Sequence, residues 1–231
     1  MASAPTLAPS SKETTNYARL CRLLVDGGTK ALRYSFDKFH SPANLFNVLK
    51  AGSTEHLTLQ ALRKKRIINA TQWGKLYPFP PSSVTSEDFD ITLLMVLLRN
   101  ICGLPAPATG WDSLPPTSDT SVEANIARVK HNRNSVYGHA SQASVNDPTF
   151  NSLWQDISSA LVVLGVDAAA ITKLKTESMD PDTETHYREL LNEWKKDEDS
   201  IKDQLDRMEG IISSVLDKIR AFFLSLNLLN D

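Results

Sequence analysis

Cysteine is scarce in this chain, with only Cys21 and Cys102 among its 231 residues. Two cysteines cannot form a disulfide framework, and no histidine stands at metal-ligand spacing beside either, so the sequence excludes a zinc centre built on them. Each cysteine lies in an apolar stretch of helical periodicity, which indicates buried thiols in a reducing compartment. We therefore expect a cytoplasmic protein that needs no metal and no other cofactor.

Long apolar runs are missing too, since no stretch approaches the roughly 20 residues that a membrane-spanning helix needs. The amino-terminal segment, MASAPTLAPSSKETT, lacks the basic and apolar regions of a signal peptide. We expect residues 1–13 to form a disordered lead, and we expect no membrane partner.

Neither sign of charge is in excess: 25 lysines and arginines oppose 27 aspartates and glutamates, for a formal charge of −2 and a pI near 6.2. This balance lacks the overall electrostatic footprint of a nucleic-acid-binding protein, so DNA is not expected as a partner and RNA contact would need a local basic patch. The densest positive run is Arg63-Lys64-Lys65-Arg66, which could follow a phosphate backbone. A solvated helix face is the alternative interpretation of that run.

Strand-like alternation and internal repeats are absent, whereas apolar residues recur at three- and four-residue spacing through most of the chain. The sequence therefore predicts an all-α fold, with a helical bundle over residues 14–177 and a helical arm over 180–231. Gly27 and Gly28 interrupt a helical stretch, and we interpret them as a close helix–helix approach. Trp73 and Tyr77 lie four residues apart and are predicted to belong to the core rather than to a base-stacking platform.

A nearly continuous apolar stretch from Phe89 to Cys102 predicts the most buried helix, capped by Thr85 or Ser86. Residues 104–118 hold four prolines and Trp111. This segment is too long for a simple connection, so it is either a surface loop pinned by Trp111 or a lid over a site.

The stretch from Thr120 to Ala140, TSVEANIARVKHNRNSVYGHA, predicts one amphipathic helix. Its start can be capped by Asp119 or Thr120, and its buried stripe should comprise the apolar residues at helical spacing, Val122, Ile126 and Val129. Gly138 is expected to adopt a left-handed conformation that ends the helix and aims His139 away from it.

Arg133 and His139 are the residues of this helix whose side chains are best suited to catalysis. Arginine offers a planar fork of donors matched to phosphate oxygens, and histidine can exchange a proton near neutral pH. On an ideal helix their six-residue separation places them well apart around the axis. They could meet only if the helix breaks at Gly138 or if a second subunit completes the site; a solvated cap at the helix end is the ordinary alternative.

The segment Arg133-Asn134-Ser135-Val136-Tyr137-Gly138-His139 resembles the R-x4–6-H signature of HEPN domains. Together with LLRNICGLPAPATGWDSLPP (97–116) and FNSLWQDI (150–157), it resembles the HEPN-like branch found in DAZ-interacting zinc-finger ubiquitin ligases and in many invertebrate immune-type proteins. The resemblance covers residues 14 to 175 and implies a HEPN-like helical bundle.

HEPN ribonucleases, as this resemblance implies, cleave RNA without metal in a homodimer and leave 2′,3′-cyclic phosphate ends. Arg133 would then clamp the phosphate and His139 would act as acid or base. Asn134 would orient the phosphate or the histidine, and Tyr137 would pack on the guanidinium or contact a base. Arg99 has two interpretations, a second phosphate contact or a cation that complements a helix dipole.

The alternative is a catalytically inactive scaffold that dimerises and binds protein partners in a signalling adaptor. Apolar residues of the arm follow many three- and four-residue steps, as in a coiled-coil seam, so a protein partner could bind through this C-terminal helix. No RING-type Cys/His spacing and no Walker loop is present, so ubiquitin-ligase activity does not transfer from the resemblance.

Overall fold

The computed structural model describes residues 11–196, and within that range the chain is all-helical with no strand, which confirms the predicted fold class. The α-helices are α1 (Lys12–Arg22), α2 (Thr29–Phe39), α3 (Leu45–Leu49), α4 (Thr54–Lys64), α5 (Ala70–Leu76), α6 (Ile91–Ile101), α7 (Val122–Gly138), α8 (Asp147–Val163) and α9 (Ala168–Thr176). Residues 181–196 are helical too. Short turns of other helix types are η1 (Leu23–Gly28), η2 (Pro42–Asn44), η3 (Pro81–Ser83) and η4 (Ser86–Asp88).

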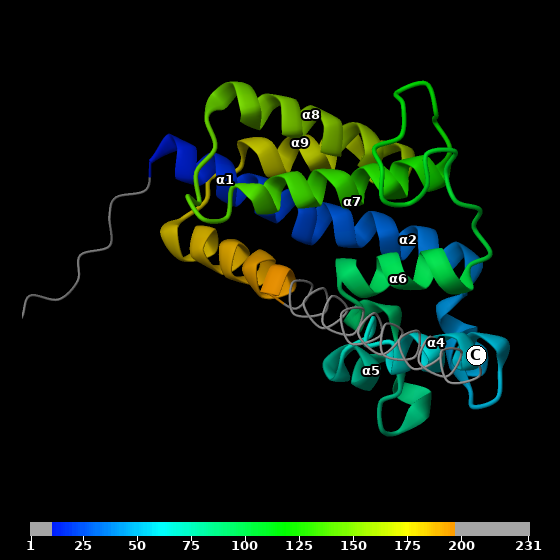
Figure 1. The fold of residues 1–231 in the computed structure, drawn as a ribbon. Coiled ribbons are helices and arrows are strands. Elements are labelled where there is room, and N and C mark those ends of the chain that lie inside the picture. Colours follow the sequence, from blue (N-terminus) through cyan, green and yellow to red (C-terminus); the bar gives the residue numbers. More distant parts are fainter. Residues whose placement is uncertain (1–10, 197–231) are drawn as a thin grey trace, which may run out of the picture.

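Helices α1 and α2 join through η1 into one long central element, with α7, α8 and α9 on one side and α6 on another (Figure 1). The smaller helices α3, α4 and α5 lie together beyond α6. Fully buried apolar side chains line the central element; they include Tyr17, Leu20, Leu24, Leu32 and Phe36. Burial of this apolar area drives assembly of the bundle.

The glycine pair allows two helices to approach the central element closely, as predicted. A Cβ at Gly27 would lie 2.9 Å from Leu161 Cδ1 of α8, and one at Gly28 would lie 2.9 Å from Ile91 Cδ1 of α6. The surrounding turn, η1, is a π-helix, a wider form that occurs mostly as short bulges within α-helices. The sequence indicated an interruption here but not its helix type.

Trp73 and Tyr77 pack against the core as expected, with ring centroids 4.3 Å apart. His56 of α4 joins them, since its Nδ1 lies 3.0 Å from the Tyr77 hydroxyl. This aromatic group ties α4 to α5.

Asp90, not Thr85 or Ser86, caps α6, because its carboxylate accepts a hydrogen bond of 2.8 Å from the Leu93 amide. Thr85 instead caps the short turn η4 that precedes α6. The expectation of a cap at Thr85 or Ser86 was therefore wrong, since the chain makes one extra turn before α6 begins. Gly103 ends the helix with a φ of +65°.

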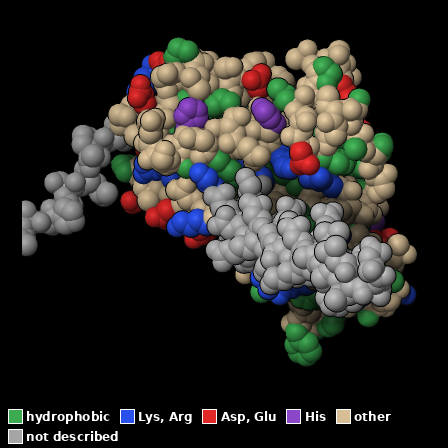
Figure 2. Space-filling model, viewed as in Figure 1, with side chains coloured by type: hydrophobic (Ala, Val, Ile, Leu, Met, Phe, Trp, Pro, Cys, Tyr) green, Lys and Arg blue, Asp and Glu red, His purple; other side chains and the backbone are tan. Residues whose placement is uncertain are grey.

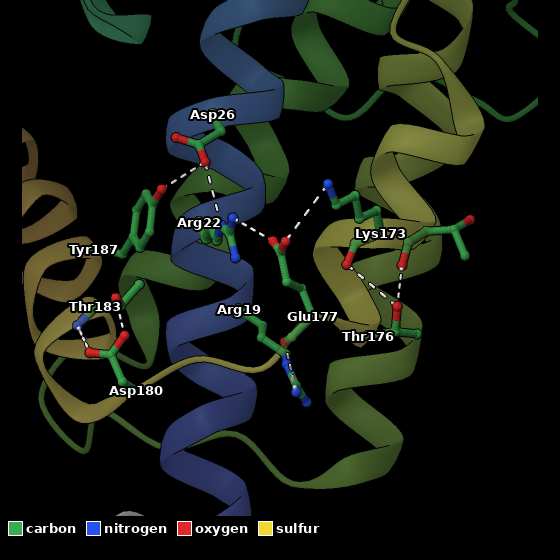
Figure 3. Close-up of polar contacts among 10 residues, drawn as sticks. Arg19, Arg22, Asp26, Lys173, Thr176, Glu177, Asp180, Thr183 and Tyr187 are labelled. Atoms are coloured by element: carbon green, nitrogen blue, oxygen red, sulfur yellow. Dashed lines mark hydrogen bonds and ion pairs between the residues drawn. The ribbon is translucent and has the colours of Figure 1, made fainter.

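Side-chain contacts of Tyr187 hold residues 181–196 against α1 and η1 (Figure 3). The Tyr187 hydroxyl donates to Asp26 at 2.8 Å, and Arg22 forms an ion pair of 2.8 Å with Glu177 just after α9. The start of the predicted arm is thus part of the bundle surface. The continuation of the arm over residues 197–231, including the expected coiled-coil seam, lies outside the described residues. Residues 1–10 of the expected lead lie outside them too, whereas residues 12 and 13 of that lead belong to α1.

Among the helices of residues 11–196, none combines the length and the apolar character needed to cross a bilayer. Both cysteines are free thiols, with Cys21 buried and Cys102 half-buried. Burial raises the pKa of each thiol to about 12, so neither has the thiolate character of a nucleophile at neutral pH.

Candidate functional site

Helix α7 begins with a side-chain cap from Ser121, whose hydroxyl accepts from the Ala124 amide at 3.2 Å. The expected caps were wrong: Asp119 instead accepts from the Ser121 amide at 3.0 Å and stabilises the turn before the helix. Ile126 and Val129 are buried as expected, but Val122 is 40% exposed because it lies in the first turn, at the edge of the bundle.

The far end of α7 also differs from expectation. Gly138 remains within the helix, and His139 follows as the C-cap with φ −91° and ψ −1°. The predicted left-handed break at Gly138 is therefore wrong, because the His139 amide donates back to the Val136 carbonyl at 3.0 Å and closes a last, tighter turn of the 3-10 type. The helix does not redirect His139 towards Arg133.

Arg133 is buried, with only 1% of its surface exposed. Its Nη1 lies 3.3 Å from Thr92 Oγ1 of α6 and 3.7 Å from Met95 Sδ, so the side chain connects α7 to α6. Its guanidinium carbon lies 5.2 Å from the ring centroid of Tyr137, which confirms the expected packing of Tyr137 on the arginine. A buried arginine at this place supports the structure, because a charged side chain is rarely enclosed without such partners.

Asn134 is the surface neighbour that this arginine orients. Both Nε and Nη2 of Arg133 donate to Asn134 Oδ1, at 3.3 and 3.1 Å. Because the oxygen accepts both bonds, the amide nitrogen of the exposed Asn134 is left to donate elsewhere. Arg133 thus orients Asn134, and the expected role of Asn134 in orienting a phosphate or the histidine stays a prediction.

His139 is half-buried at the end of α7. Over residues 11–196, no hydrogen bond or ion pair engages its imidazole, and none joins it to Arg133. His131 lies on the exposed side of the same helix, and Figure 2 shows histidine side chains on this face of the molecule. Within the described part of one chain, Arg133 and His139 are not brought together as a catalytic pair.

Arg99 and the loop between α6 and α7 meet beside this helix. Arg99 Nη1 lies 3.4 Å from Asp112 Oδ1, and its guanidinium carbon lies 5.6 Å from the Trp111 ring centroid. Lys130 of α7 forms a second ion pair with the same Asp112 oxygen. The loop is thus attached to both helices, and Asp112 and Lys130 are members of this cluster that the sequence pattern did not identify.

The basic run from Arg63 to Arg66 forms the end of α4 and the turn after it. Arg63 donates to the Ile68 carbonyl at 3.0 Å, and Arg66 has a left-handed φ of 61°. Lys64, Lys65 and Arg66 are exposed. Cations at this place complement the helix dipole, and among the described contacts none connects them with the end of α7.

The carboxyl-terminal helix contributes one contact that the sequence did not suggest. Lys195 donates from Nζ to the Tyr137 carbonyl at 3.3 Å, so residues 181–196 reach the last turn of α7. No group of three potential metal ligands occurs among residues 11–196.

An all-α bundle that carries an arginine and a histidine at the end of one long helix, in the pattern R-x5-H, defines a HEPN-type domain. Residues 42–187 match the family described as DZIP3/hRUL138-like HEPN, and the chain belongs to that family. Over 175 residues, or 72% of the chain, it is 30% identical to the E3 ubiquitin-protein ligase DZIP3 of Mus musculus and to that of Homo sapiens. The matched part spans 14% of each of those ligases. No solved structure gives a significant match.

Proposed function

We propose that this chain is an RNA-directed HEPN module whose exposed side of α7 contacts single-stranded RNA. The observation that carries the proposal is the orientation of Asn134. Two hydrogen bonds from the buried Arg133 to Oδ1 leave the amide nitrogen as a donor on the surface, where a phosphate oxygen can accept from it.

The surroundings of Asn134 support this contact. His131 lies three residues before it and Gly138 four residues after it, on the same side of the helix. No heavy atom lies within 4 Å of a Cβ built at Gly138, so this surface is open to a ligand. His139 follows directly, with an imidazole that can donate to a phosphate oxygen or a base edge.

Arg133 acts in this proposal as a positioning residue, because its guanidinium is 1% exposed and a phosphate cannot reach it without rearrangement of α6 and α7. Binding without cleavage is therefore the activity that the geometry supports best. The protein acts on RNA through a preorganised surface, in which the donor is already aimed before the ligand arrives.

A second candidate is a metal-independent endoribonuclease formed by a homodimer. It is favoured by the His139 imidazole, which engages no hydrogen-bonding partner over residues 11–196. A second copy of the chain could complete the active site in which this imidazole acts as an acid or base. In this form the products carry 2′,3′-cyclic phosphate ends, because the 2′-hydroxyl loses its proton and attacks the adjacent phosphorus while the bond from phosphorus to the 5′-oxygen of the next nucleotide breaks and that oxygen takes up a proton.

The test is fluorescence anisotropy of a labelled single-stranded RNA with the full chain and two variants, Asn134→Ala and His139→Ala. We expect each variant to weaken binding by about fivefold, the value of one hydrogen bond of about 1 kcal/mol. His186→Ala is the matched control, because it removes an exposed histidine from the helix of residues 181–196. Its affinity should equal that of the native chain.

The same RNA incubated in EDTA distinguishes the two candidates. Intact RNA with a measurable affinity supports the binding module, whereas cyclic-phosphate products that disappear in His139→Ala establish the nuclease. Sedimentation of the protein alone reports whether a homodimer is available to form a shared cleft. If no RNA binds, the proposal is overturned and the catalytically inactive protein scaffold takes its place.

A further inference from the structure

Asp112 lies between two cations that belong to different helices. Its Oδ1 accepts from Arg99 Nη1 of α6 at 3.4 Å and from Lys130 Nζ of α7. One carboxylate cannot neutralise two positive charges, so the cluster retains a net charge of +1. Figure 2 shows basic and acidic side chains side by side on this part of the surface.

The acid and the cations differ in how they are held. The side chains of Arg99 and Lys130 are 31% and 22% exposed and come from helices, whereas that of Asp112 is 71% exposed and comes from the loop. The cations therefore form a fixed, partly enclosed pair, and the carboxylate covers them from the solvent side. The hydrogen bond from Lys130 lowers the pKa of Asp112, so the acid is ionised at neutral pH.

The ion pairs that Arg22 forms have a different construction. Arg22 of α1 pairs with Asp26 of the adjoining η1 turn and with Glu177 just after α9 (Figure 3). Those acids lie within or beside the packed helices, so they contribute to packing. Asp112 is held instead by a long loop, and a loop can move without unpacking a helix.

A carboxylate and a phosphate present similar oxygens to arginine and lysine, which bind both. The space that Asp112 fills is thus one that a phosphate group can occupy with the same two donors. Lys130 is one helical turn ahead of Arg133 and four residues ahead of Asn134, so this space adjoins the surface proposed above to contact RNA.

We propose that Arg99 and Lys130 form a phosphate-binding site, and that Asp112 closes it until an RNA phosphodiester group displaces the carboxylate. The identity of the ligand as RNA rests on the proposed function, whereas the existence of an oxyanion-binding site does not. The loop of residues 102–121 is then a competitor that the ligand must replace, which lowers the affinity of the resting protein.

The experiment compares Asp112→Ala with Asp156→Ala. Asp156 is an exposed acid of α8 that takes part in no hydrogen bond or ion pair with residues 11–196, so both variants add one unit of positive charge. Anisotropy with single-stranded RNA should show about fivefold tighter binding for Asp112→Ala than for Asp156→Ala, the effect of releasing two surface ion pairs. The plot of log affinity against log salt should steepen by about one unit. Adding Lys130→Gln to Asp112→Ala should abolish both changes.

A second arm uses inorganic pyrophosphate and measures the shift in melting temperature, in which ligand binding to the folded state appears as stabilisation. Stabilisation of Asp112→Ala but not of Asp156→Ala supports the oxyanion site, even if no variant binds RNA and the proposed function fails. Equal responses of the two variants to both RNA and pyrophosphate overturn the site. Circular dichroism of each variant verifies that it is folded, which ensures that a missing response is not caused by unfolding of the variant.

Discussion

Replacement of Arg133 by alanine should destabilise the fold, because the guanidinium is an internal connection between α6 and α7. The variant loses the hydrogen bond to Thr92 Oγ1 at 3.3 Å and the contact with the Tyr137 ring at 5.2 Å. It also loses its hydrogen bonds to Asn134, whose exposed amide oxygen can bond to water instead.

The magnitude follows from these contacts. The hydrogen bond and the cation–π contact contribute about 1 kcal/mol each. Removing the buried aliphatic part of the side chain costs about 1–2 kcal/mol more. The sum is about 3–4 kcal/mol in the free energy of unfolding, which corresponds to a fall in melting temperature of about 6–16 °C for a chain of this size.

Urea unfolding followed by circular dichroism measures this free energy, and a melting curve measures the temperature shift. His139→Ala is the paired variant from the other end of the signature. Because its imidazole engages no described partner, its free energy of unfolding should change by less than about 0.5 kcal/mol. Arg133→Met keeps the aliphatic length and should fall between the two.

The refuting result is a loss below about 1 kcal/mol for Arg133→Ala, equal to that of His139→Ala. Arg133 would then not connect the helices, and the hypothesis that it binds the RNA phosphate at the surface would be favoured instead. The comparison also has a practical consequence: a loss of RNA activity in Arg133→Ala is informative only when the variant is measured under conditions where it is folded.

Three further predictions address the loop, a turn and the carboxyl-terminal helix. Gly165→Ala should cost about 1–2 kcal/mol of unfolding free energy in urea, because φ is +98° and a Cβ would lie 2.6 Å from the Tyr34 ring; a neutral result would contradict this packing. The hydrogen bond from Lys130 lowers the pKa of Asp112 in the folded protein. The ionised Asp112 carboxylate therefore stabilises the loop at pH values above its unfolded pKa, near 3.8, and this stabilisation is lost as the pH falls through its lower pKa in the folded protein. Tryptophan fluorescence should therefore show an acid transition that is missing in Asp112→Asn. Tyr187→Phe removes the hydrogen bond to Asp26 at 2.8 Å and should cost about 1 kcal/mol, with Asp26→Asn giving a similar loss; hydrogen exchange of residues 181–196 reports whether that helix detaches.

Local patterns predicted the elements of this fold because they depend on spacing alone. Apolar residues at helical intervals predicted the bundle, and short polar side chains directly before two of the helices, Asn146 and Asp167, cap α8 and α9. Caps failed where two candidates stood close together: Asp90 replaced Thr85 and Ser86, and Ser121 replaced Asp119 and Thr120. Several neighbouring oxygens can serve as a cap, and the packing of the next helix selects among them.

The sequence alone determined the helical class, the family to which the R-x5-H signature belongs and the position of Tyr137 one helical turn after Arg133. Only the tertiary structure decided that Arg133 points inward to Thr92, that Asn134 presents its amide outward and that Asp112 joins Arg99 to Lys130. The physical reason is that a side chain's place along a helix follows from its own sequence. Whether that side chain contacts solvent, another helix or a loop depends on segments that are dozens of residues away in the sequence.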